Sequence, residues 1–328
     1  MKDEKQKVCI VGAGSLGTAL AQAMVENKSL DIILYSIEPE VVKCIKEESI
    51  NCKYFPNIRL NPDIKISDDI SVIRNVDFLL LAIPSIAIPS FIRDHKHIIG
   101  NNTIIVNLAK GFGEGNHTII DVISNIVDNP VCTLKGPGFA REIINGMPTA
   151  LTLAAKDISL HNKFIDLFKG TTLYTDFSTD ITGVELCSIL KNIYAIVIGI
   201  VDAHFDSPNL RSLMFTRAIV EMKKILIDFG GNEETIFNYC GIGDLSLTSL
   251  NDLSRNRTLG LLIGKGFFDD SISDKVVLEG KIAVNVFCEE IAKRADLKVD
   301  YPIIAELYDI FNGNANVSGF VNRLLEKC

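Results

Sequence analysis

In the first half of the chain, short apolar runs rich in β-branched residues alternate with longer stretches of helical spacing. Such alternation is typical of βαβ units and predicts a parallel sheet covered by helices. We expect a first helix from about Ser15 to Asn27. We expect seven strands, near residues 8–11, 31–35, 78–83, 103–107, 131–134, 150–154 and 173–175. The pattern therefore predicts a doubly wound α/β domain.

The pattern changes after about residue 179, where long stretches of helical spacing, interrupted by glycines, replace the alternation. We therefore expect a domain boundary near residue 180, with an α/β domain over residues 1–180 and an all-α domain over residues 181–328. Nothing between them has the composition of a flexible linker, so we expect a tight interface with a ligand cleft.

Charge narrows the range of partners. The chain carries 33 Lys and Arg against 41 Asp and Glu, which gives a net charge of −8. The sequence has no run of Lys and Arg long enough to attract a polyanion to this negatively charged protein, so nucleic acid is excluded as a partner. A small anionic substrate could still be bound by local basic residues.

The cysteines, histidines and apolar runs bear on the redox compartment, on metal binding and on membrane insertion. The eight cysteines are scattered without a Cys-x-x-Cys pair, and this predicts reduced thiols in the cytoplasm. No signal-peptide pattern precedes the first strand. The apolar run 193–201 is shorter than the ~20 residues that a bilayer requires, so no membrane insertion is expected. His95 and His97 have no further partner at ligand spacing, so we expect no metal site.

A glycine-rich turn gives the first positive sign of function. Gly12-Ala13-Gly14-Ser15-Leu16-Gly17 follows the first predicted strand and opens the first predicted helix. In that setting a G-x-G-x-x-G pattern favours a Rossmann-type dinucleotide site over a purely structural turn. In such a site the pyrophosphate of the dinucleotide lies at the helix N-terminus.

The end of the second predicted strand bears on which dinucleotide binds. Glu38 lies 21 residues after Gly17, close to where an acidic residue would bind the ribose hydroxyls, although it could instead be a solvated loop charge. No Lys or Arg occurs between positions 35 and 42, which favours NAD over NADP.

Two further candidates follow predicted strands. Lys110 lies just beyond the run 103–107, at the edge where open α/β sheets bind ligands, but it could also be an exposed loop lysine. The segment Gly136-Pro137-Gly138 could bring backbone N–H groups close to a cofactor, or form a structural turn.

Lys191 stands in a helix that is apolar on every side. Burying an ammonium there is costly unless it is paired or faces a cleft, so Lys191 is a site candidate. The alternatives are a lysine that extends to the surface or an ion pair with Glu185. Asn192 beside it could orient a substrate.

A second polar cluster contains Asp244 and the segment Ser254-Arg255-Asn256. Ser254 is a candidate N-cap, so helix amides and a guanidinium would converge on an anion. The alternative is a capped surface helix with solvated arginines.

Together these segments resemble the bacterial-type NAD(P)-dependent glycerol-3-phosphate dehydrogenases. The matching segments run in the same order over nearly the whole chain: 12–21, 109–111, 136–142, 190–192, 243–245, 254–257 and 277–280. The resemblance implies a 6-phosphogluconate-dehydrogenase-like fold. It also implies reversible reduction of dihydroxyacetone phosphate by NAD(P)H to sn-glycerol 3-phosphate for glycerophospholipid synthesis.

The resemblance also implies roles for individual residues, with Lys191 as proton donor and acceptor. The implied substrate positions are Lys110, Gly136, Lys191, Asp244, Ser254, Arg255 and Asn256. The implied cofactor positions are Gly12, Gly14, Ser15, Leu16, Gly17, Ile37, Lys110, Gly136, Gly138, Ala140, Arg255, Val277 and Glu279. Three residues depart from the family: Leu16 replaces an aromatic, Gly138 a hydroxyl residue, and Ile37 a polar or basic residue.

Lysine chemistry suits this reaction. A lysine with the ordinary pKa of about 10.4 is protonated at pH 7 and ready to donate to a carbonyl oxygen, whereas oxidation needs the neutral amine. We therefore expect the oxidation rate to rise steeply with pH and the reduction rate not to. The competing hypotheses are a related dehydrogenase of a small hydroxy acid and a catalytically silent dinucleotide sensor. A homodimer is expected.

Overall fold

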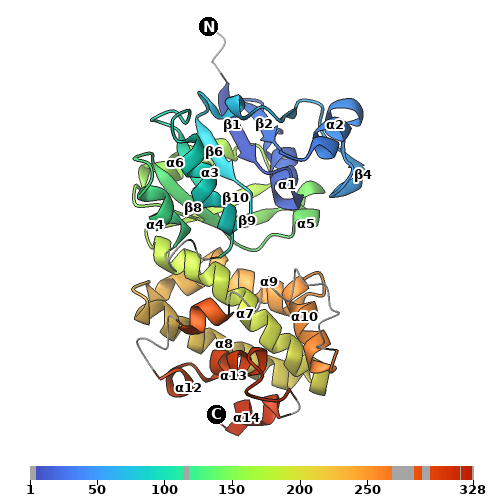
Figure 1. Ribbon diagram of the computed structural model, residues 1–328, viewed down its shortest axis with the longest axis vertical. Helices are drawn as coiled ribbons and strands as arrows, with labels where there is room; N and C mark the ends of the chain where they lie inside the picture. The colour runs from blue at the N-terminus through green and yellow to red at the C-terminus, as the bar shows by residue number, and fades with distance from the viewer. Residues whose placement is uncertain are drawn as a thin grey trace. The chain divides into compact units, whose positions relative to one another are not determined.

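The computed structural model describes residues 5–111, 113, 118–267, 284–289, 296–317 and 319–326. The chain divides into two compact units, Met1–Ile181 and Thr182–Cys328 (Figure 1). The first unit is α/β. In the described part of the second unit every regular element is a helix, so the expected fold class is confirmed.

The first unit is built on an eight-stranded sheet of order β10-β9-β8-β7-β6-β1-β2-β5. Its strands are β1 (Gln6–Val11), β2 (Leu30–Tyr35), β5 (Lys65–Ser67), β6 (Phe78–Leu81), β7 (Ile104–Asn107), β8 (Val131–Lys135), β9 (Thr149–Ala154) and β10 (Leu173–Ser178). The chain runs outward from β1 in both directions, to β2 on one side and β6 on the other. The carboxyl end of β1 is therefore the switch point at which such sheets bind ligands.

The sheet differs from expectation in three respects. All seven predicted strands form, but the edge strand β5 was missed because its three residues include Lys65 and Ser67 and show no apolar run. A separate hairpin of β3 (Ile50–Asn51) and β4 (Phe55–Arg59) was missed as well. Finally, β8 and β9 pair antiparallel, whereas every other neighbouring pair within the eight-stranded sheet is parallel.

Strand β1 shows why both faces of the sheet are covered. Val8 and Ile10 belong to one apolar core and Cys9 and Val11 to the other, as the two-residue period of a strand requires. Helices α1 (Ser15–Met24), α2 (Pro39–Glu48) and α6 (Ser159–Leu167) contribute to the first core, and α3 (Ile88–His95) and α4 (Ile119–Ser124) to the second. The short helices η1 (Ile70–Ile73), η2 (Ser85–Ala87) and α5 (Ala140–Ile144) complete this unit. Helix α1 ends three residues earlier than predicted.

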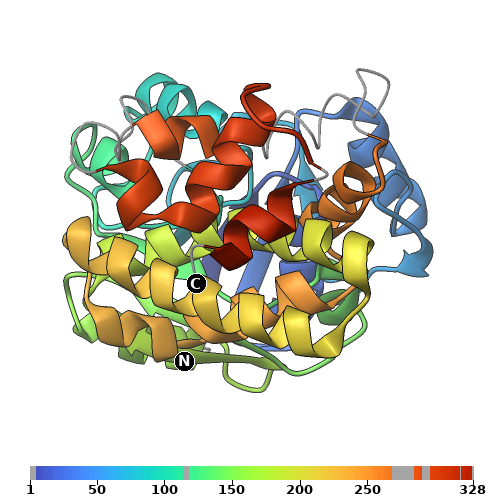
Figure 2. The ribbon, with the colours of Figure 1, turned by 90° about the horizontal axis from the view of Figure 1, so that it is seen from below.

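The second unit is built around the long helix α7 (Ile181–Phe205), and Figure 2 shows its helices in yellow-green to red. The others are α8 (Pro208–Asp228), η4 (Glu233–Phe237), η5 (Tyr239–Gly243), α9 (Asp244–Leu250), α10 (Arg255–Gly264), α12 (Leu297–Asp300), α13 (Pro302–Phe311) and α14 (Phe320–Glu326). Helix α7 is far longer than the apolar run 193–201. It is long and apolar enough to cross a bilayer, with a mean hydropathy of 1.9, but 94% of that window is buried in the protein, which is typical of a core helix.

The expectation that all the cysteines are reduced is wrong for two of them. Cys44 in α2 and Cys52 in the turn after β3 form a disulfide across a Cα–Cα distance of 6.1 Å. The chain reverses after α2 and enters the hairpin, which returns Cys52 to the helix. Spacing alone could not reveal this pair, because the tertiary reversal brings the two residues together. Cys9, Cys132, Cys187, Cys240 and Cys288 are buried free thiols.

Candidate functional site

The glycine-rich turn between β1 and α1 has the geometry that a dinucleotide needs. Gly12 has a φ of +107°, and a Cβ there would lie 2.6 Å from the carbonyl oxygen of Ala82. A Cβ on Gly17 would lie 2.0 Å from the oxygen of Gly12, whereas one on Gly14 would meet nothing within 4 Å. Two glycines thus close the turn and the third leaves open space at the N-terminus of α1. Ser15 is exposed there, and Leu16 packs partly against the core.

Glu38 follows β2 as the N-cap residue of α2. The Tyr54 hydroxyl donates to Glu38 at 3.1 Å, and Lys53 forms a hydrogen-bonded ion pair with the same side chain. The bond from Lys53 holds the pKa of Glu38 below its ordinary value. Glu38 is therefore held by the β3–β4 hairpin and is not simply a solvated loop charge. Ile37 beside it is 81% exposed.

The predicted residues beyond β7 and β8 also lie at the carboxyl side of their strands. Lys110 is exposed after β7, and the buried Lys135 of β8 donates from Nζ to the carbonyl of Ala109. Gly136 has a φ of +149°, and a Cβ there would be 3.0 Å from the Cα of Leu151. Gly138 precedes α5, whose first residue is Ala140. Lys135 therefore donates to the residue before Lys110. It was missed from the sequence because its position is that of the last residue of an ordinary strand.

In the second unit, Lys191 is buried and ion-paired. Its Nζ lies 2.5 Å from Oδ1 of Asp244 and 3.0 Å from the hydroxyl of Thr248, and all three side chains are buried. The ion-pair partner of Lys191 is thus Asp244 of α9, whereas the sequence had suggested Glu185 as a candidate. Thr248 was missed, although it stands one helical turn after Asp244 and so shares its face of α9.

A distorted turn places Asp244. Residues Tyr239–Gly243 form a turn that is kinked at Gly241, whose ψ of −110° is non-helical. A Cβ on Gly241 would lie 2.0 Å from the carbonyl oxygen of Ile236, so only glycine fits there. Asp244 is the first residue of α9, directly after this turn.

The start of α10 carries the predicted anion-binding residues. Ser254 caps the helix by accepting from the N–H of Arg257 at 3.3 Å, which confirms the expected N-cap. Asn256 donates to Oδ1 of Asn192 at 2.9 Å, so the residue after Lys191 is joined to α10. Arg255 is exposed at this end of the helix.

Within the second unit the structure therefore brings together Lys191 with Asp244, and Asn192 with Asn256. Two predicted cofactor residues, Val277 and Glu279, lie outside the described residues. Among the residues that the structure describes, no group of three or more His, Cys, Asp or Glu side chains could hold a metal ion.

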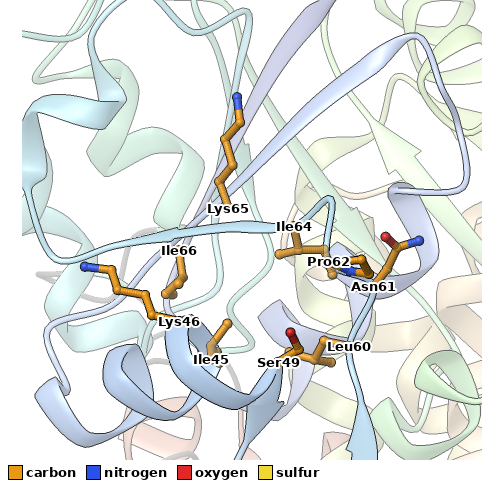
Figure 3. A pocket seen from close by; sticks show the side chains of 9 residues that line it. All are labelled: Ile45, Lys46, Ser49, Leu60, Asn61, Pro62, Ile64, Lys65 and Ile66. Carbon is orange, nitrogen blue, oxygen red and sulfur yellow. The ribbon is translucent and has the colours of Figure 1, made fainter.

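A surface cavity of about 450 Å³ lies apart from the glycine-rich turn, between α2 and the segment that leads into β5 (Figure 3). Its apolar lining includes Ile45, Leu60 and Ile64. Its two lysines are engaged, Lys46 with Asp68 at 3.5 Å and Lys65 with Asp31 at 2.7 Å. None of the predicted site residues that the structure describes lines this cavity.

Comparison with known proteins gives matches over most of the chain. The family model described as NAD-dependent glycerol-3-phosphate dehydrogenase N-terminus matches residues 7–161, and the corresponding C-terminus model matches residues 180–322. A glycerol-3-phosphate dehydrogenase (NAD(P)+) of Clostridium botulinum is 34% identical over 310 residues, which cover 93% of this chain and 92% of the relative. One of Legionella pneumophila is 32% identical over 331 residues, covering 98% of each.

Solved structures agree with these sequence matches. The crystal structure of glycerol-3-phosphate dehydrogenase from Coxiella burnetii has a TM-score of 0.89 at 30% identity and covers 98% of this chain and 99% of that one. A ketopantoate reductase from Ralstonia eutropha has a TM-score of 0.58 at 14% identity, covering 94% of this chain and 99% of that one, and shares the fold alone.

Proposed function

Since this chain belongs to the NAD-dependent glycerol-3-phosphate dehydrogenase family and reduces dihydroxyacetone phosphate with NAD(P)H, we propose that Lys191 is the proton donor and acceptor of that reaction. The observation that carries the proposal is the buried ion pair of Lys191 with Asp244. A lysine enclosed in an apolar helix and held by one carboxylate and one hydroxyl has a defined position.

The neighbours of Lys191 suit the reduction direction. A bound NAD(P)H would supply the hydride, and the oxygen of the reacting carbonyl would then gain negative charge. Lys191 donates its proton to that oxygen, while Asp244 stabilises the ammonium form before transfer. In the reverse direction Lys191 must first lose its proton against the same carboxylate, so oxidation is favoured by high pH.

The test is Lys191→Met, which keeps the length of the side chain and removes the ammonium. We expect kcat for dihydroxyacetone phosphate reduction to fall by about 10²–10⁴-fold, the usual contribution of a general acid, while NADH fluorescence titration still shows binding. Lys265→Met, an exposed lysine at the C-cap of α10, is the matched control and keeps wild-type kcat. A Lys191→Met enzyme with more than a tenth of wild-type kcat overturns the role.

The substrate phosphate is assigned to the start of α10. Arg255 presents a guanidinium beside a capped helix N-terminus, and both favour a phosphate. Ser254 and Asn256 stand in the same turn, with Lys110 and Gly136 as the substrate residues of the first unit. Arg255→Ala should raise KM for dihydroxyacetone phosphate at least tenfold, whereas an unchanged KM rejects this assignment.

The fit of the dinucleotide rests on the glycine-rich turn, where a Cβ would block closure of the turn at Gly12 or Gly17 and Gly14 faces open space. We infer that Gly12 to Gly17 hold the pyrophosphate, with Ile37, Gly138, Ala140, Val277 and Glu279 as further cofactor residues. Because Glu38 is a carboxylate close to the end of β2, it can accept from a ribose hydroxyl, so NAD is the expected cofactor. A higher kcat/KM with NADPH than with NADH overturns this preference.

Assaying NADH oxidation with different substrates distinguishes two alternative functions, a dehydrogenase of a small hydroxy acid and a catalytically silent sensor. If the chain acts on a small hydroxy acid, NADH oxidation occurs with the corresponding keto acid and not with dihydroxyacetone phosphate. A silent sensor binds NADH and oxidises it with neither. We further infer a cytoplasmic homodimer that supplies glycerophospholipid synthesis; light scattering should give twice 36.1 kDa.

A further inference from the structure

A buried amide lies directly behind the glycine-rich turn. Asn51, the last residue of β3, has a side chain with no solvent exposure. Its Nδ2 donates to the carbonyl oxygen of Ala13 at 2.9 Å and to the hydroxyl of Thr18 at 2.8 Å, and its Oδ1 accepts from the N–H of Tyr54 at 3.2 Å. Both amide donors are thus used to connect the hairpin to the turn and to α1.

The carbonyl of Ala13 is the point at which these bonds converge. The Thr18 hydroxyl, one turn into α1, also donates to it, at 3.2 Å. In a planar trans peptide the C=O and the following N–H point in opposite directions. Holding the Ala13 oxygen towards Asn51 therefore directs the N–H of Gly14 away from Asn51. The side of Gly14 on which a Cβ would meet no atom within 4 Å gives a ligand room to approach.

The same hairpin reaches the other part of the expected cofactor site. Lys53 and Tyr54, two and three residues after Asn51, hold Glu38 at the end of β2. Residues 51–54 therefore connect the turn assigned to the pyrophosphate with the acid assigned to the ribose.

We propose that Asn51 is a positioning residue for the dinucleotide, acting with Thr18 through the Ala13 carbonyl to set the orientation of the Ala13–Gly14 peptide. The proposal rests on the cofactor site proposed above. It predicts an effect on cofactor affinity, because the described hydrogen bonds of Asn51 go to the glycine-rich turn, to α1 and to the hairpin.

The first test compares Asn51→Ala with Asn57→Ala, an exposed asparagine on the same hairpin. NADH dissociation constants are measured by fluorescence titration, together with KM for each substrate and kcat at saturating NADH. For Asn51→Ala we expect the dissociation constant and the KM of NADH to rise about tenfold, the effect of losing one well-placed hydrogen bond. The kcat and the KM of dihydroxyacetone phosphate should stay within about twofold of wild type, and Asn57→Ala should match wild type throughout.

The second test removes the hydroxyl of Thr18 at nearly constant size in one variant and keeps the hydroxyl in another. Thr18→Val loses the hydroxyl and should weaken NADH binding severalfold, whereas Thr18→Ser keeps it and should restore affinity. The effects of Asn51→Ala and Thr18→Val should not be additive, because both act on one carbonyl. This pair decides the question even if Asn51→Ala does not fold.

Wild-type NADH affinity in Asn51→Ala or Thr18→Val overturns the proposal, and so does an equal loss in kcat and in both KM values. Failure of the proposed function looks different: the wild-type protein would not oxidise NADH with dihydroxyacetone phosphate, while titration would still measure the contribution of Asn51.

Discussion

Asp202 is a buried anion of the second unit, and its ion pairs allow a test of how burial sets their contribution to stability. It stands in α7 with its side chain 3% exposed. The Nε of Arg211 donates to its two oxygens at 2.7 and 2.8 Å, and Arg257 of α10 forms a buried ion pair with it. Arg257 also donates to the carbonyl of Ser249 at 3.0 Å. The carboxylate of Asp202 thus joins α8 and α10 to α7 through ion pairs.

Asp202→Asn keeps the shape of the side chain and removes its charge, which leaves the guanidinium of Arg257 buried beside a neutral amide. Removing one partner of a buried ion pair typically costs about 3–5 kcal/mol. The matched control is Asp252→Asn, which acts on the same arginine, since Arg257 Nε lies 3.2 Å from Asp252, but that carboxylate is 88% exposed. A solvated pair contributes less than about 1 kcal/mol.

Urea denaturation followed by circular dichroism measures both variants against wild type. We expect the free energy of unfolding of the second unit to fall by about 3–5 kcal/mol in Asp202→Asn and by less than about 1 kcal/mol in Asp252→Asn. Equal losses in the two variants would refute the reasoning, because they would show that burial does not decide the strength of these pairs.

Three further outcomes follow from buried or constrained groups. Burial raises the pKa of Glu221 to about 7 although the N–H groups of Ile303 and Ile304 donate to it, so the folded state binds a proton more tightly than the unfolded state. Stability should therefore fall by up to about 3 kcal/mol as pH rises from about 4.5 to about 7, and denaturation curves of Glu221→Gln across this range should lack that component. Reducing the Cys44–Cys52 disulfide, whose cysteines are 8 residues apart, should lower the stability of the first unit by about 2–3 kcal/mol, and a Cys44→Ser, Cys52→Ser double variant should show no response to a dithiol. Gly260→Ala would place a Cβ 2.1 Å from the carbonyl oxygen of Ile196, so melting experiments should show a loss of about 1–3 kcal/mol; a wild-type melting curve would mean that α7 and α10 separate at little cost.

Several predictions could be made from local sequence because they depend on neighbours along the chain. The strand before Gly12, the glycine turn and the helix after it form a continuous pattern of apolar period and backbone freedom, and the structure has all three. The cap at Ser254 is equally local, since its hydroxyl bonds to an N–H three residues later. The unusual position of Lys191 in an apolar helix could also be seen without a structure.

The partners of these residues could not be predicted in the same way. Asp244 and Thr248 meet Lys191 across separations of 53 and 57 residues, and Asn51 meets Ala13 across 38. The edge strand β5 forms because β2 offers it a parallel neighbour, although its own three residues carry no strand pattern.

The sequence by itself determined the fold class, the family and the positions at which polar groups interrupt apolar elements, because periodicity and short motifs are properties of adjacent residues. Only the tertiary structure decided which groups share charge and hydrogen bonds: Lys191 with Asp244, Cys44 with Cys52, and Asn51 with the Ala13 carbonyl. The physical reason is that a buried polar group takes its partner from whatever element the fold packs against it, at a sequence distance that no local pattern records.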